Sequence, residues 1–91
     1  MPSYKAPVED ALFLLNDVFA IDRYNNIPGF ADASADVVEA VLAEAAKFCE
    51  EVLLPLNRTG DEEGCRRESD GRVTTPKGFK EAYQRIVAGG W

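Results

Sequence analysis

Apolar residues recur at helical spacing in three separate stretches of the chain. In the first stretch they return every three or four positions from Val8 to Phe19, so they line one face of a helix. This pattern predicts a helix over residues 8–19. Phe13 and Leu14 lie off its apolar face, and a helix that is apolar on more than one side usually has more than one neighbour.

The second stretch carries the longest apolar stripe and predicts a helix over residues 36–57. Asp36 is a suitable N-cap, and Glu39 stands at the spacing of a capping box. Pro55 has no N–H to donate to residue 51, so we expect it to kink or end this helix. The stripe comprises Val38, Val41, Leu42, Ala45, Cys49, Val52, Leu53 and Leu56.

The third stretch predicts a helix over residues 76–88. Thr75 is the expected cap, Pro76 suits the first helical position, and Gly89 stands just past the end. Its apolar face is formed by Phe79, Ala82, Tyr83 and Ile86.

Long connectors separate the three predicted helices. Residues 20–35 show no periodicity, and residues 58–75 contain several glycines and clustered charges. Within the second connector, Asp70-Gly71 is a turn signal, and residues 72–74 are expected to be extended. The fold class is therefore all-α, with three main helices. Connectors of about 15 residues argue against a self-contained bundle.

Composition removes several classes of function. The chain has 16 acidic and 10 basic residues, a formal net charge of -6, which disfavours nucleic acid and anionic lipid as partners. It has no histidine and two cysteines, which excludes Ser-His and Cys-His nucleophiles and the usual zinc sites. No signal peptide opens the sequence, and no apolar run approaches the length of a membrane span. We expect a cytoplasmic protein.

Each candidate site has a simpler interpretation. Asp61-Glu62-Glu63 lacks the spacing of a calcium loop and is interpreted as a solvated charge run. The acidic residues between Gly60 and Gly64 would repel phosphate, which excludes a phosphate-binding loop. Glu50 and Glu51 are expected to face water.

The cysteines and the final tryptophan also carry no assigned chemistry. Cys49 lies on the apolar stripe and is expected to be buried. Arg66 and Arg67 beside Cys65 would favour a reactive thiolate, but incidental exposure is the preferred interpretation. Trp91 either packs on the third helix or belongs to a chain that continues. We assign no catalytic, cofactor-binding or metal-binding residue.

Three segments, in this order, resemble the acyl-CoA dehydrogenase superfamily. Residues 47–61 (KFCEEVLLPLNRTGD) resemble the end of its long N-terminal helix, and residues 71–79 (GRVTTPKGF) and 88–91 (AGGW) resemble the segments after that helix. Residues 4–16 look like the additional N-terminal segment of a longer-chain branch. That branch includes dehydrogenases acting on unusual thioesters such as 3-methylmercaptopropionyl-CoA. The resemblance covers almost all of residues 1–91.

The resemblance implies that residues 1–91 are part of an N-terminal helical domain, with a middle β domain and a C-terminal helical domain absent. Full-length members hold FAD and acyl-CoA between these domains. There a glutamate base removes the α-proton and hydride passes to the flavin. None of the motifs for that chemistry lies in these residues, so we expect no FAD to bind and no catalysis by this chain alone.

Two interpretations of function remain open. In the first, the chain is the structural N-terminal part of an FAD-dependent acyl-CoA dehydrogenase, and its apolar faces pack on the remaining domains. In the second, it is a small helical module that associates with itself or with a partner through the same faces. A small independent enzyme is disfavoured because no convergent set of polar residues is present.

Overall fold

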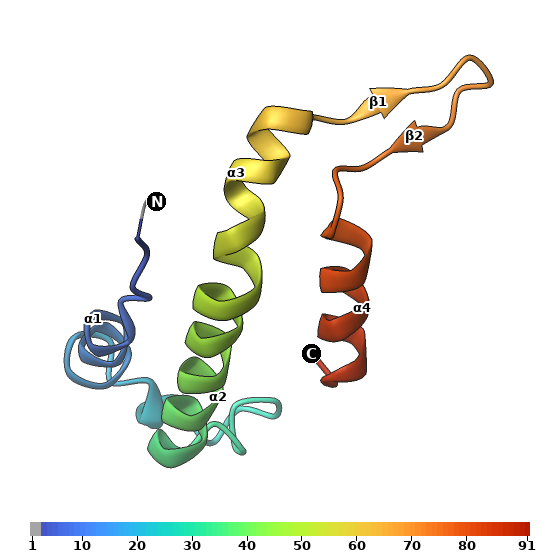
Figure 1. The fold of residues 1–91 in the computed structure, drawn as a ribbon. Coiled ribbons are helices and arrows are strands. Elements are labelled where there is room, and N and C mark those ends of the chain that lie inside the picture. The colour runs from blue at the N-terminus through green and yellow to red at the C-terminus, as the bar shows by residue number, and fades with distance from the viewer. Residues whose placement is uncertain (1–2) are drawn as a thin grey trace.

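The computed structural model describes residues 3–91 and shows helices joined by a protruding hairpin (Figure 1). The all-α prediction is confirmed, with a two-stranded hairpin added. The N-terminal helix runs close to the predicted bounds but changes from α1 to the π-helical segment η1. The elements are α1 (Val8–Leu12), η1 (Phe13–Val18), the 3-10 helix η2 (Ile21–Tyr24), α2 (Ala35–Phe48), the π-helical η3 (Cys49–Leu53), α3 (Leu54–Glu63), β1 (Arg66–Arg67), β2 (Val73–Thr74) and α4 (Phe79–Ala88).

The elements α2, η3 and α3 follow one another without a break and form the long helix that crosses Figure 1. The predicted end at residue 57 was wrong, because the helix continues to Glu63. Pro55, which has no N–H to donate, lies in the first turn of α3, directly after η3. In η3, just before it, the Leu54 N–H donates to the Cys49 carbonyl, five residues back. This wider turn makes room for the proline ring, so the helix bulges instead of ending.

The start of α2 also differs from the prediction. Ser34 is the N-cap, and its Oγ accepts a hydrogen bond from the Val37 N–H at 3.4 Å. Asp36 instead lies in the first helical turn, where its carboxylate favours the positive end of the helix dipole. Serine and aspartate are comparable N-caps, so the sequence offered two nearby starts, and the predicted capping box does not form.

The α4 helix begins at Phe79, three residues later than predicted. Thr75 is not its cap, because Pro76 to Phe79 form a turn in which the Phe79 N–H donates to the Pro76 carbonyl at 3.2 Å. Gly78 stands before the helix with φ of 91°, a left-handed conformation that glycine adopts without strain. The chain reverses its direction before α4, which runs back alongside the long helix (Figure 1).

The hairpin lies in the second predicted connector, residues 58–75. Its two strands pair antiparallel, with Arg66 opposite Thr74 and Arg67 opposite Val73. The Asp70-Gly71 turn is confirmed: Asp70 Oδ1 accepts from the Arg72 N–H at 3.1 Å, and Gly71 has φ of 90°. The extended segment at residues 72–74 matches β2, whereas the partner strand β1 was missed.

The described chain buries very little of itself. Its radius of gyration is 17.6 Å, against about 12 Å for a compact domain of this length. Its accessible surface is 7358 Å², against roughly 5,200 Å² for a compact protein of this mass. Among residues 3–91 only Ala82, at 5% exposure, and Pro76 are buried. The helices therefore form an open frame without a closed core.

Two glycines with the same backbone conformation test how closely α4 approaches α3. Gly78 and Gly71 have φ of 91° and 90°, but a Cβ at Gly78 would lie 2.6 Å from Leu56 Cδ2, while at Gly71 it would meet nothing within 4 Å. Both Gly→Ala changes cost about 1–2 kcal/mol of backbone strain. We expect Gly78→Ala to cost more than Gly71→Ala, because the end of the Leu56 side chain must move aside.

Circular dichroism measures this difference as the loss of helical signal in each variant. Gly71→Ala is the matched control, since it carries the strain without the contact. Equal losses of helical signal in the two variants would show that α4 does not rest on Leu56.

Candidate functional site

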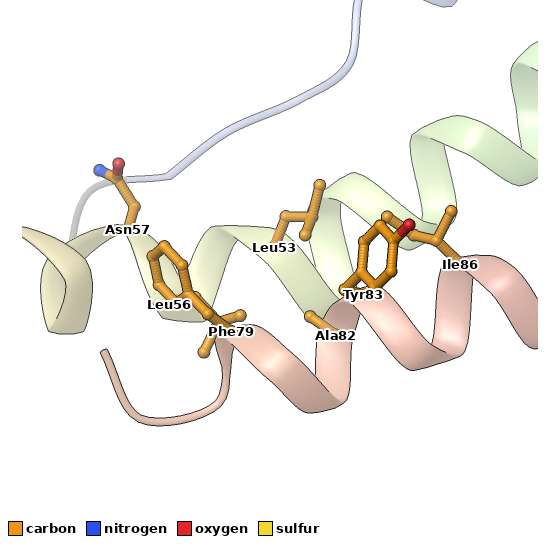
Figure 2. Close-up of a pocket in the computed structure, with 7 residues that line it drawn as sticks. All are labelled: Leu53, Leu56, Asn57, Phe79, Ala82, Tyr83 and Ile86. Carbon is orange, nitrogen blue, oxygen red and sulfur yellow. The ribbon is translucent and has the colours of Figure 1, made fainter. Parts of the chain in front are cut away.

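An apolar groove lies between α4 and the helix formed by η3 and α3. Figure 2 shows side chains from both helices facing one another across it. Its volume is 310 Å³, and we call it the α4 groove. It is lined by Leu53, Leu56, Asn57, Phe79, Ala82, Tyr83 and Ile86.

Small residues allow side chains of α4 and of the long helix to approach one another closely. Gly60 faces the Phe79 ring so closely that a Cβ there would lie 2.6 Å from Phe79 Cζ. Ala82 is buried where α4 meets the long helix, and Figure 2 shows its methyl group pointing toward that helix. The apolar face predicted for the third helix is therefore the face that lines the groove. The periodicity of the sequence was enough to predict this face of α4, but not the residues of α3 that lie opposite it.

The other side of the groove is open. The side chain of Tyr83 is 66% exposed, and those of Leu53 and Phe79 are each 38% exposed. Asn57 is the only polar amide in the lining, and Figure 2 shows it at one end, pointing away from α4. Such a surface favours an apolar partner, because a polar group buried there would lose its hydrogen bonds to water.

The groove does not fit a flavin dinucleotide. The two phosphates of FAD need cationic side chains or clusters of backbone N–H donors. The lining contains no lysine or arginine and contributes one amide. We therefore place no step of flavin chemistry in this groove.

Two carboxylates accept backbone hydrogen bonds, the half-buried Glu50 and Glu63, which stays exposed as expected. Glu50 Oε1 accepts from the Ala6 N–H at 3.0 Å and fastens the N-terminal segment to η3. Glu63 Oε2 accepts from the Lys77 N–H at 2.9 Å and fastens the turn before α4 to the end of α3. The expectation that Glu50 faces water was wrong, since it is half-buried, whereas Glu51 is exposed. Periodicity gives no signal for such long-range contacts.

The acidic run 61–63 does not converge on a single point. Glu62 pairs with Arg58 one helical turn earlier, at 2.7 Å, while Glu63 holds the Lys77 backbone. Between residues 3 and 91 no group of three acidic, cysteine or histidine side chains is placed to hold a metal ion.

The cysteines differ in exposure. Cys65 is exposed, as expected, between the end of α3 and β1. Cys49 is half-buried, so the expectation of a buried thiol was wrong. The cause is the open frame, which leaves even the apolar stripe of the long helix partly uncovered.

Trp91 folds back against the end of α4. The backbone N–H of Trp91 donates to the Ile86 carbonyl at 3.4 Å. The indole ring lies 3.2 Å from the position that a Cβ at Gly89 would occupy. The ring lines a shallow hollow with Phe48 and Arg85, yet 57% of Trp91 stays exposed. Packing on the third helix is thus incomplete.

Within the described part of the chain, none of the helices combines the length and the apolar composition that a bilayer crossing requires. No protein-family model matches the sequence.

Two curated proteins resemble this chain. It is 36% identical over 89 residues to the 3-methylmercaptopropionyl-CoA dehydrogenase of Ruegeria pomeroyi, which covers 98% of this chain and 15% of that protein. It is 31% identical over 78 residues to the butyryl-CoA dehydrogenase of Syntrophomonas wolfei, covering 84% of this chain and 12% of that protein. The chain thus spans only a small part of the length of these relatives. On this similarity, which agrees with the family suggested by residues 47–61 and 71–79, the chain belongs to the acyl-CoA dehydrogenase family.

Proposed function

We propose that this chain is a structural part of an FAD-dependent acyl-CoA dehydrogenase, contributing helices of the N-terminal domain. In this proposal the complete enzyme removes two hydrogens from the α and β carbons of an acyl-CoA thioester. The flavin pocket and the glutamate base come from polypeptide outside residues 1–91. The similarity to two acyl-CoA dehydrogenases over 98% and 84% of this chain is the observation that carries the proposal.

The open frame supports a structural role. An accessible surface of 7358 Å² exceeds that of a compact protein of the same mass by roughly 2,100 Å². Much of it is apolar, including the α4 groove and the exposed Phe13, Val18 and Phe19 of the N-terminal helix. Large apolar side chains exposed in this way mark sites of contact with other protein. Packing against further domains of a dehydrogenase would cover it.

The described residues offer little to a reacting thioester. The α4 groove has no ionisable side chain apart from the Tyr83 phenol, and the nearby carboxylates Glu50 and Glu63 are engaged with backbone N–H groups. General acid–base chemistry needs a positioned group with a free proton-transfer path to substrate. The proposed contribution of this chain is therefore the shape and stability of a wall, with catalysis supplied elsewhere.

A domain replacement tests this proposal. The 89 matching residues of the Ruegeria pomeroyi dehydrogenase are replaced by this chain, and the purified chimera is assayed for bound flavin and for the dehydrogenase activity of the parent enzyme. We expect stoichiometric flavin and activity within about ten-fold of the parent, because packed domains tolerate substitutions that keep the volume and polarity of the side chains. A chimera that folds but has lost flavin and activity would contradict the proposed role.

A variant of the chimera locates the contact. Tyr83→Lys places an ammonium group in the α4 groove, and if the other domains cover the groove, we expect a loss of about 3 kcal/mol or more in unfolding free energy. Gln84→Lys introduces the same group on the next, exposed residue of α4 and is the matched control. Equal stability of the two variants would show that the groove stays open to water in the complete enzyme.

The isolated chain provides a second, independent test. Purified by itself, we expect it to show no visible flavin absorbance and to take up no FAD on titration, since the α4 groove has no donors for the phosphates. Stoichiometric binding of FAD to residues 1–91 would overturn the claim that the flavin pocket lies elsewhere.

A further inference from the structure

The segment that precedes α1, residues 3–7, is fastened to the long helix by one side chain. The Ala6 N–H donates to Glu50 Oε1 at 3.0 Å, and both residues are half-buried although 44 positions separate them in the sequence. In Figure 1 this segment lies on one side of the long helix and α4 lies on the other. We call residues 3–7 the strap.

A hollow separates the strap from the long helix. Its volume is 480 Å³, and it is lined by Ser3, Tyr4, Cys49, Leu53, Leu54 and Asn57. The strap therefore forms one wall of this hollow, and the opposite wall includes Cys49, which is half-buried. A solute that approaches Cys49 from this side must pass the strap.

The two ends of the strap are held differently. At its C-terminal end Pro7 leads directly into α1, which packs against α2, and the Pro7 carbonyl accepts from the Ala11 N–H at 3.0 Å. Toward the N-terminus, residues 3–5 are exposed. A segment with few buried contacts opens at low cost. In the described part of the chain, the bond to Glu50 is the hydrogen bond that joins the strap to η3, and a carboxylate is a strong acceptor.

We propose that the strap is a closing device. When the Ala6 N–H is bound to Glu50, the strap restricts access to Cys49, and when that bond breaks, the strap moves away about Pro7 and solutes reach the thiol. The device uses contacts within this chain, so it does not depend on the proposed function.

Thiol alkylation in the complete chimera tests the proposal, because there the long helix is supported by the other domains. The folded chimera is treated with iodoacetamide, and the modification of each cysteine is followed over time by peptide mass spectrometry. Cys65, which is exposed between α3 and β1, is the internal reference. Its rate should be the same in every variant, since it lies outside the hollow beneath the strap.

The first variant removes the donor of the bond. Ala6→Pro eliminates the N–H and leaves the charge of Glu50 unchanged, and we expect Cys49 to be alkylated about ten-fold faster. Lys5→Pro is the matched control, because it introduces the same ring into the strap and keeps the Ala6 N–H. We expect it to leave the Cys49 rate within about three-fold.

The second pair of variants changes the acceptor. Glu50→Ala removes it, and we again expect a rise of about ten-fold in the Cys49 rate. The lost negative charge would also favour the thiolate and speed alkylation without any movement of the strap. Glu50→Gln controls for this effect, because it removes the charge and keeps a carbonyl oxygen that accepts from the Ala6 N–H. We expect its rate to stay within about three-fold of the original.

Two results would overturn the strap. One is equal Cys49 rates in Ala6→Pro and Lys5→Pro. The other is a Glu50→Gln rate as high as that of Glu50→Ala, which would assign the effect to charge. Circular dichroism and flavin content confirm that each variant is folded. Ala6→Pro lies outside every helix, so the comparison of the two proline variants stands even where Glu50→Ala does not fold.

These outcomes are separate from those of the proposed function. A chimera with flavin and activity in which Ala6→Pro leaves the Cys49 rate unchanged would refute the strap and keep the role in the dehydrogenase. A folded but inactive chimera in which Ala6→Pro speeds alkylation would do the reverse.

Discussion

The contact between α4 and the helix formed by η3 and α3 holds the C-terminal half of this molecule in place. It depends on close approach, since Gly60 leaves space for the Phe79 ring and Gly78 leaves space for Leu56. The hydrogen bond from the Lys77 N–H to Glu63 closes the turn that leads into it. Ala82, on α4, is buried to 5% exposure. The other residues of α4 are partly or fully open to water.

The bulge at Pro55 positions that contact. A regular α-helix would have to end near the proline, because the ring clashes with the carbonyl four residues earlier and no N–H is available. The wider π-helical turn of η3 makes room for the proline ring. The helix then continues for about two more turns to Glu63. Those two turns contain Gly60, which lies against the Phe79 ring of α4, and Glu63, which accepts a hydrogen bond from the turn before α4.

Helix existence could be predicted from the sequence, whereas helix ends and tertiary contacts could not. The apolar periodicity of residues 8–19 and 76–88 is strong enough to identify both helices and the inner face of the second. The choice of Ser34 over Asp36 depends on which of two adequate caps the chain uses. The turn at Gly78 is held by the hydrogen bond from the Lys77 N–H to Glu63, a contact that local pattern does not encode.

The candidate site, too, could be predicted from the sequence only in part. The apolar face of α4 was visible as a stripe, but its pairing with Leu53 and Leu56 on the other helix required the structure. The roles of Glu50 and Glu63 were missed, because a carboxylate that accepts a distant backbone N–H looks in sequence like any surface carboxylate.

The central claim is that this chain lacks a core of its own and needs other protein to cover its apolar faces. Native-state hydrogen exchange at a concentration of about 2–5 μM tests it most directly, by measuring the free energy at which the α4 amides open. The account predicts opening free energies close to zero for α4 residues such as Tyr83 and Ile86. Protection of those amides by several kcal/mol in a dilute, monomeric sample would contradict it.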